Sequence, residues 1–197
     1  LAKTKRVIGV PFVFFFLSII SVLVWSGSFA AVISMNHIEV NQDIPQGKNL
    51  VWEPKIRYMA LYMFFGILWV TAFFEYCSTF TIMVSACTYY WNSDAHEDGD
   101  ADVSVGFSAC FSHAGSLAIG SFIIAVIRFI RIVFMVLAKQ IEKQSGDNAV
   151  VKGMVKCAEC VLTCIEKICN YINESAFAYQ ACSGENFCSS AWNAFML

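Results

Sequence analysis

The chain has 197 residues, of which 58% are hydrophobic and 14% charged, and its formal net charge is −2. This composition is too apolar for an ordinary soluble domain, so we expect an integral membrane protein in the plasma membrane or an organellar membrane, in contact with membrane lipid. The small negative charge provides no basic surface for nucleic acid, and we expect no nucleic-acid partner.

The first apolar stretch covers residues 7–35 and follows the basic residues Lys3, Lys5 and Arg6. It carries no charged residue and exceeds the roughly 20 residues that a helix needs to cross a bilayer. Because a signal peptide has a shorter apolar core, we predict a membrane-spanning helix. The positive-inside rule puts the basic residues in the cytosol and the polar loop 36–57 on the other side.

The second apolar stretch covers residues 58–91, and Glu75 is its only charged residue. On a helix, Trp69, Phe73 and Tyr76 share one face, with Glu75 about 100° around the axis. Aromatic faces helped by a carboxylate bind quaternary ammonium groups, and an ionisable residue at mid-membrane depth is a functional candidate. We therefore predict that these four residues bind substrate. The alternative is a packed or lipid-facing aromatic stripe in which Glu75 is protonated or paired with another helix.

The acidic loop after this stretch contains Asp98, Asp100 and Asp102, a spacing that suggests a calcium-binding loop. An EF-hand requires Gly at its sixth position and Glu at its twelfth, where this chain has Val103 and Ala109. We therefore predict a solvated loop with no metal site.

The third apolar stretch covers residues 107–138 and carries Arg128 and Arg131 past its middle. Small residues recur at every fourth position in its first part, so on one helix they form a narrow stripe that a neighbouring backbone can approach. These residues are Ser108, Ser112, Ser116 and Gly120. Together with His113, the last three of them are candidates for helix packing, or for gating a transport path.

Residues 146–197 differ from the three apolar stretches because their charges are periodic. Over residues 151–170 the cysteines share a face with apolar side chains, and lysines and glutamates share the opposite face, which predicts an amphipathic helix at the membrane interface. Cys157, Cys160 and Cys164 fit packed thiols, acylation sites or zinc ligands. We expect them to face lipid or a neighbouring helix and to bind no metal. Asn173 begins a glycosylation pattern, Asn-Glu-Ser.

Together these segments predict an all-α polytopic transmembrane helix bundle. We expect about three full spans within residues 1–145 and amphipathic or re-entrant helices within residues 146–197. Beyond Ile127 the direction of the chain stays open, because Lys139 and Lys143 would lie on the side that the positive-inside rule disfavours.

The C-terminal segment carries a specific motif, Gly-Glu-Asn-Phe-Cys-Ser-Ser-Ala-Trp-Asn-Ala-Phe, over residues 184–195. This motif, with the cysteine spacing before it, resembles the C-terminal signature of the choline transporter-like family. The matching signature residues are Asn186, Cys188, Ser190, Asn193 and Phe195. The segment from His113 to Gly120, and Trp69, also resemble that family. The chain departs from it at Ser78 and Thr79, where family members usually carry Gly-Gln.

The resemblance implies a protein of about ten spans, of which this chain is an internal piece. It also implies facilitative or antiport movement of choline or a related quaternary amine without ATP, with a small cationic amine as substrate and the remaining spans of the polypeptide as partners. No Gly-x4-Gly-Lys nucleotide motif contradicts this. His37, His96 and His113 lie in separate regions, so we expect neither an enzyme nor a cofactor. The alternative is a non-transporting structural subunit among neighbouring membrane subunits of a larger assembly.

Overall fold

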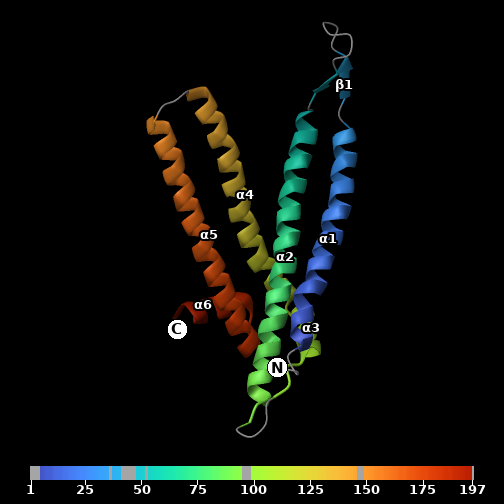
Figure 1. Ribbon diagram of the computed structural model, residues 1–197, viewed down its shortest axis with the longest axis vertical. Helices are drawn as coiled ribbons and strands as arrows, with labels where there is room; N and C mark the ends of the chain where they lie inside the picture. The colour runs from blue at the N-terminus through green and yellow to red at the C-terminus, as the bar shows by residue number, and fades with distance from the viewer. Residues whose placement is uncertain are drawn as a thin grey trace.

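The computed structural model describes residues 5–35, 37–40, 48–51, 53–94, 99–145 and 149–196. Its elements in chain order are α1 (Lys5–Ser34), β1 (His37–Val40), β2 (Lys48–Val51), α2 (Pro54–Asn92), α3 (Val103–Ser112), α4 (Ala114–Ser145), α5 (Ala149–Ser183) and α6 (Phe187–Met196). The long helices α1, α2, α4 and α5 form the body of the molecule, and the short α3 and α6 lie toward one end of it (Figure 1). Three residues discussed above, Lys3, His96 and Asp98, lie outside the described residues.

Within the described residues, three helices are long and apolar enough to cross a membrane: Arg6–Ser34, Pro54–Asn92 and Ala114–Lys143. Many of their apolar side chains point outward, and on α1 the side chains of Phe12, Phe16 and Val24 are exposed. Lipid tails are as apolar as these side chains, so this surface suits a bilayer. The predicted all-α transmembrane bundle is therefore confirmed, with one addition, an antiparallel hairpin of β1 and β2 between α1 and α2.

The central helix is α2, which contacts α1, α3, α4 and α5. Pro54 occupies its first turn, where the missing N–H costs no hydrogen bond. At 1.5 Å per residue, its 39 residues extend about 58 Å, well beyond the roughly 30 Å of a bilayer core. The indole N–H of Trp25 on α1 donates to the Met63 carbonyl of α2 at 2.9 Å and joins the two helices.

The third apolar stretch is broken at His113, so the prediction of one helix over residues 107–138 is wrong. One helix, α3, ends at Ser112, and α4 begins at Ala114. The Ser112 hydroxyl donates to the Ser108 carbonyl at 3.1 Å, a local bond that competes with a regular helix. The predicted stripe of small residues is therefore divided between two helices.

Gly106 allows α3 to pack closely on α2. A Cβ at this position would lie 2.7 Å from the Thr81 carbonyl oxygen and 2.8 Å from the Ser85 hydroxyl oxygen, both on α2. Only glycine fits this contact without a shift. At the start of α3, Asp102 accepts the Ser104 N–H as a helix cap, and the hydrogen bonds from Ser104 hold the pKa of Asp102 below its ordinary value.

The helix α5 is longer than the amphipathic segment predicted over residues 151–170, and it returns beside α4 (Figure 1). Its polar face turns toward α4, where Glu166 pairs with Arg131. Cys157, Cys160 and Cys164 are exposed on α5. The predicted amphipathic pattern is present, and on its polar face Glu166 and Asn170 turn into the bundle, whereas Lys152 and Lys156 are exposed. Such an arrangement suits a helix that lies against the bundle with its apolar face toward lipid.

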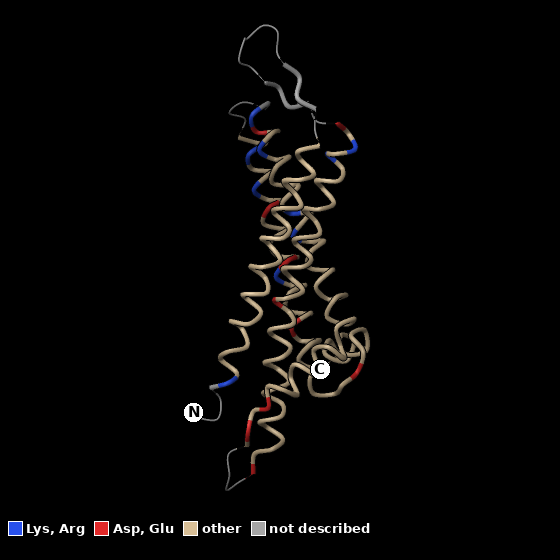
Figure 2. The backbone as a smooth tube through the Cα atoms, turned by 90° about the vertical axis from the view of Figure 1, so that its right-hand side faces the viewer, with Lys and Arg blue, Asp and Glu red and all other residues tan. Residues whose placement is uncertain are grey.

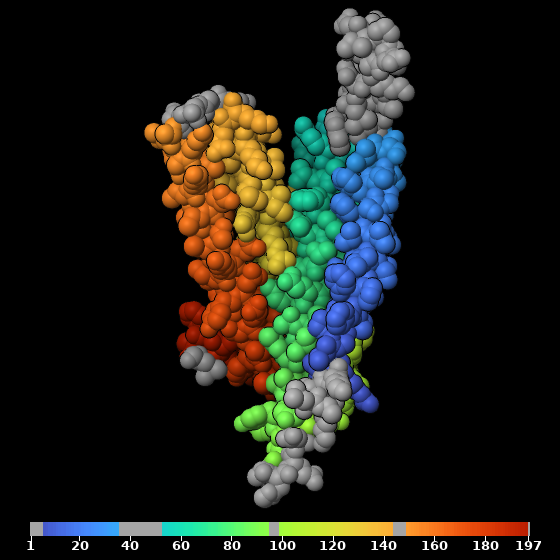
Figure 3. Space-filling model, in the orientation of Figure 1, coloured from blue at the N-terminus to red at the C-terminus, as the bar shows by residue number. Residues whose placement is uncertain are grey.

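The buried core lies where α2, α4 and α5 meet and α6 covers them. Its largest fully buried side chains are Phe80, Leu117, Ile124 and Phe177, each at most 1% exposed. Beyond the core, α1 and α2 diverge from α4 and α5, so the two pairs stand apart at the upper end of Figures 1 and 3. The helices are therefore held together mainly at one end.

Candidate functional site

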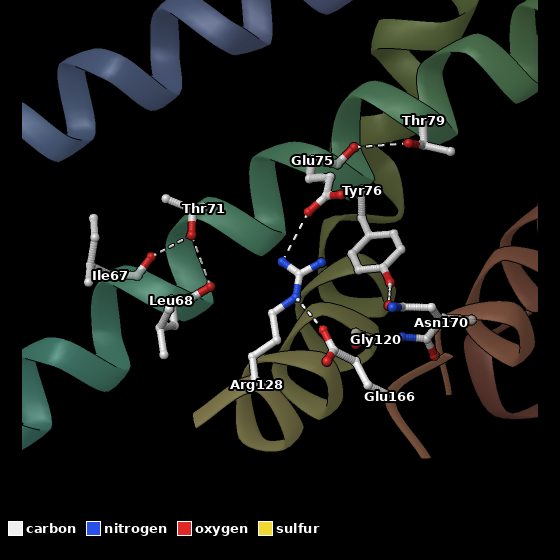
Figure 4. A network of polar contacts seen from close by, with 11 residues as sticks. Ile67, Leu68, Thr71, Glu75, Tyr76, Thr79, Gly120, Arg128, Glu166 and Asn170 are labelled. Carbon is white, nitrogen blue, oxygen red and sulfur yellow. Dashed lines mark hydrogen bonds and ion pairs between the residues drawn. The ribbon is translucent and has the colours of Figure 1, made fainter. Parts of the chain in front are cut away.

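Figure 2 shows a few charged residues partway along the helices, between their charged ends. Four charged side chains from α2, α4 and α5 meet within the bundle, and Figure 4 shows three of them, Glu75, Arg128 and Glu166. Glu75 of α2 accepts a hydrogen bond from Arg128 of α4 at 3.1 Å. The Arg128 guanidinium also lies 3.6 Å from Glu166 of α5, and Arg131 of α4 pairs with the same glutamate. These four residues are called the ion-pair network below.

The formal charges of the ion-pair network cancel, because it contains two arginines and two glutamates. A lone charge inside a bilayer is costly, so charges at this depth pair with one another. The side chain of Glu166 is 15% exposed and that of Arg128 is 28% exposed, whereas that of Glu75 is 59% exposed. Glu75 is therefore the member of the network that a ligand can reach.

Glu75 borders a cavity of about 530 Å³ between α1 and α2, called the Glu75 cavity below. Aromatic rings from both helices line it, namely Phe14, Phe15 and Phe74. Ser78 and Thr79, where the chain departs from the family pattern, line it as well. The cavity thus combines aromatic rings and hydroxyl groups with one carboxylate, the groups that attract an organic cation in apolar surroundings.

Trp69 and Phe73, two members of the predicted binding set, border a different cavity of about 240 Å³, next to Ala118 of α4. The indole N–H of Trp69 donates to the Ala118 carbonyl at 3.1 Å, and its ring packs edge-on against Phe122, with the centroids 5.4 Å apart. The structure therefore does not bring Trp69 and Glu75 to one cavity.

Tyr76, the fourth member of the predicted set, is buried and turned toward α5. Its hydroxyl donates to Asn170 Oδ1 at 3.0 Å (Figure 4), and its ring centroid lies 5.2 Å from that of Phe177.

The side-chain amide of Asn173, which is 3% exposed, donates to the Gly120 carbonyl at 2.8 Å. The asparagine of the glycosylation pattern is therefore a packing residue in this fold, inaccessible to a glycan.

His113 occupies the break between α3 and α4. Its ring lies edge-on to that of Phe80, with the centroids 5.9 Å apart, and its Nδ1 is 3.1 Å from Nε2 of the buried Gln180. The histidine thus touches α2 and α5 at the point where the backbone changes from one helix to the next.

Gly120 of α4 packs against Phe177 of α5. A Cβ at this position would lie 2.5 Å from the Phe177 ring. Ser116, one turn earlier, is half-buried, and Ser112 is exposed on α3. Of the candidate packing residues, Gly120 therefore has the strongest steric requirement.

The C-terminal motif builds the corner between α5 and α6. Gly184 has φ +73°, a left-handed conformation that glycine adopts without strain. The Glu185 carboxylate accepts a hydrogen bond from Asn193 at 3.0 Å, and Ser190 is fully buried. The ring of Phe187 lies 5.3 Å from that of Phe177 in the core. Asn186, Cys188 and Phe195 are exposed.

Sequence reasoning missed the surroundings of Glu75. Phe14 and Phe15 come from α1, Arg128 from α4 and Glu166 from α5, so no spacing within one segment relates them to Glu75. The available signal is the rule that charges at mid-membrane depth need partners. That rule indicates a pairing of Glu75 with one of the arginines in the third apolar stretch, without saying which.

A family model described as plasma-membrane choline transporter matches residues 1–197. The chain is 28% identical over 199 residues to Choline transporter-like protein 3 of Homo sapiens. This alignment covers 98% of this chain and 30% of that protein. It is 31% identical over 143 residues to Choline transporter-like protein 1 of Mus musculus, covering 72% of this chain and 22% of that protein. It is 32% identical over 147 residues to Choline transporter-like 2 of Drosophila melanogaster, a match that covers 73% of this chain and 18% of that protein.

The chain thus spans less than a third of the length of these curated relatives. The family resemblance inferred from the C-terminal motif is confirmed by the match over the whole chain. The prediction of an integral membrane protein is also confirmed, because the family match agrees with the three apolar helices.

Proposed function

Because this chain belongs to the choline transporter family, we propose that the intact protein moves choline or a related quaternary amine across its membrane. The movement is facilitative or by antiport and uses no ATP, and the protein acts as a transporter and not as an enzyme. The chain contributes three apolar spans and the α5–α6 corner to a longer polypeptide, whose other spans complete the path.

The observation that carries this proposal is the Glu75 cavity. A quaternary ammonium group cannot donate hydrogen bonds, so its binding relies on aromatic faces and a nearby negative charge. The rings of Phe14, Phe15 and Phe74 border the same cavity as the Glu75 carboxylate. Its volume of about 530 Å³ falls in the range typical of small-molecule sites, roughly 300–1,000 Å³.

The ion-pair network allows Glu75 to exchange its partner Arg128 for a substrate cation. Without substrate, Arg128 neutralises Glu75 at 3.1 Å. When a cation binds Glu75, Arg128 still has Glu166 as a second partner, 3.6 Å away. The bound cation leaves one positive charge in excess over the balanced network, which weakens binding. Weak binding suits a transporter, because the substrate has to leave again.

Radiolabelled choline uptake into proteoliposomes that contain the full-length protein tests this proposal. We expect saturable uptake by the wild type and a much higher apparent KM for Glu75→Gln. A matched control is Glu142→Gln, which makes the same change near the end of α4. Absence of uptake by the wild type would overturn transport and favour a structural subunit. Wild-type uptake by Glu75→Gln would remove the Glu75 cavity from the path and leave transport standing.

A further inference from the structure

Two thiols from different helices lie in direct contact at the end of the bundle that holds α3. Cys87 near the end of α2 and Cys182 near the end of α5 are 95 residues apart in the chain, and their sulfur atoms are 2.9 Å apart. A disulfide has a sulfur–sulfur distance of about 2.05 Å, so the two atoms need to approach by only about 0.9 Å to bond. Both cysteines are free thiols in the structure.

The other close cysteine pair within the described residues shows what distinguishes this one. Cys77 and Cys110 are only 3% and 5% exposed, so their thiols are shielded inside the core. Cys182 is exposed and Cys87 is half-buried. The second pair is therefore accessible from outside the protein and the first is not, and thiol reactivity follows access.

The position of the pair relative to the membrane indicates a switch and not a permanent bond. Arg6 of α1 and Asp102 border one cavity, so the start of α1 lies at the same end of the bundle as the start of α3 (Figure 1). The basic residues before the first span predict, by the positive-inside rule, that this end faces the cytosol, whereas Lys139 and Lys143 at the opposite end count against it. We take this end as cytosolic. Cytosolic glutathione keeps thiols reduced, and disulfides that form there are usually transient and redox-sensing.

We propose that Cys87 and Cys182 form a reversible disulfide that ties α2 to α5 under oxidising conditions. The oxidant is a hydroperoxide, which accepts two electrons. The exposed Cys182 thiolate attacks a peroxide oxygen and becomes a sulfenic acid, releasing water or an alcohol. The Cys87 thiol then attacks that sulfur, forms the S–S bond and releases a second water. Two successive exchanges with a small thiol such as glutathione restore both cysteines.

The bond joins the two helices that carry the glutamates of the ion-pair network, Glu75 on α2 and Glu166 on α5. Movement of helices relative to one another accompanies alternating access in transporters. Oxidation therefore slows uptake, a consequence that rests on the proposed function, whereas disulfide formation itself does not.

Peptide mapping tests the bond independently of transport. Full-length protein in liposomes is treated with hydrogen peroxide, blocked with N-ethylmaleimide, digested and examined by mass spectrometry. We expect a linked pair of peptides that contain Cys87 and Cys182, lost after dithiothreitol. Cys182→Ser abolishes this link, and the matched exposed control Cys188→Ser retains it. Alkylation of both Cys87 and Cys182 after peroxide treatment, or a link from Cys182 to Cys188, would overturn the proposal.

Choline uptake measures the consequence. We expect peroxide to remove most uptake by the wild type and by Cys188→Ser, dithiothreitol to restore it, and Cys182→Ser to be insensitive. If the linked peptides form while uptake is unchanged, the disulfide stands and its effect on transport is refuted. If untreated protein shows no uptake but the linked peptides form, the disulfide is supported and the proposed function fails.

Discussion

A carboxylate in an apolar helix needs a countercharge, and Glu75 has one in Arg128. Its other side is open to the cavity lined by Phe14, Phe15 and Phe74. This position separates Glu75 from Glu166, whose carboxylate is held between two arginines. The two glutamates of one network therefore have different surroundings, and we propose that Glu75 meets the ligand while Glu166 stabilises the fold.

In our proposal the substrate cation contacts the aromatic rings of the Glu75 cavity, and replacing Phe74 tests this contact. A cation–π contact contributes about 0.5–2 kcal/mol, so Phe74→Ala is expected to raise the apparent KM for choline roughly twofold to thirtyfold. Trp69→Ala is the comparison, because Trp69 borders the other cavity. We expect it to leave KM nearly unchanged. A larger KM effect from Trp69→Ala than from Phe74→Ala would place the substrate on the α4 side of α2 instead.

Glu166 is expected to stabilise the fold, because its removal leaves Arg128 and Arg131 with one remaining carboxylate. Leaving a buried charge unpaired costs about 3–5 kcal/mol, and the partial exposure of these side chains reduces this to about 1–3 kcal/mol for Glu166→Gln. Thermal unfolding of purified protein measures the loss. The double variant Glu166→Gln with Arg131→Gln is expected to recover part of it. Additive losses in the double variant would show that the two residues do not interact.

At the scale of helices, close contacts decide where the chain turns. Gly106 brings α3 against α2, and Gly120 brings α4 against α5. Between these two glycines, the helix breaks at His113. One straight helix would carry both contacts in fixed register. Both α3 and α4 contact α2, and beyond the break α4 also packs against α5 and α6.

Gly120→Ala is expected to destabilise the protein by about 1–3 kcal/mol, the usual cost of overpacking, because its Cβ would lie 2.5 Å from the ring of the fully buried Phe177. Gly66→Ala on α2 is the matched control, since no atom lies within 4 Å of a Cβ there. It should be neutral, or stabilising by about 0.5–1 kcal/mol through helix propensity. The midpoint of thermal unfolding in detergent compares them. Equal midpoints for the two variants would show that α4 and α5 do not pack at Gly120.

At the scale of the whole molecule, the inward polar face of α5 makes this helix part of the bundle. Glu166 and Asn170 bond to α4 and α2, while Cys157, Cys160 and Cys164 are exposed. At 1.5 Å per residue, the 35 residues of α5 extend about 52 Å, enough to cross a bilayer. A helix lying at the interface would expose the opposite face to water.

Side-specific labelling distinguishes a crossing α5 from an interfacial one. We prepare two otherwise cysteine-free variants, one that retains Cys188 and one with Val150→Cys near the start of α5. If α5 crosses the membrane, a membrane-impermeant maleimide applied from outside intact cells labels the Val150→Cys variant, and Cys188 reacts only after permeabilisation. Labelling of both sites from one side would contradict a crossing helix.

The sequence by itself determines that this is a membrane protein, which segments are apolar helices and which family it belongs to. Each of these conclusions rests on local information: the absence of charge over residues 7–35, the length of an apolar stretch, or a contiguous motif such as residues 184–195. The sequence also singles out Glu75, because one carboxylate in an apolar stretch requires an explanation wherever the other helices lie.

Only the tertiary structure decides which way each face points and which side chains meet. The period of α5 defines two faces, but whether the polar face turns to water or to Arg131 depends on a partner helix. Phe14, Arg128 and Cys182 are far in sequence from the α2 residues that they approach, and no spacing rule relates positions on different helices. The break at His113 is likewise seen only in the fold, where Gly106 packs on α2 and Gly120 on Phe177 of α5. Local pattern indicates most of the helices but not the break at His113, and the site depends on long-range packing, because the energies that arrange helices arise between segments and not within them.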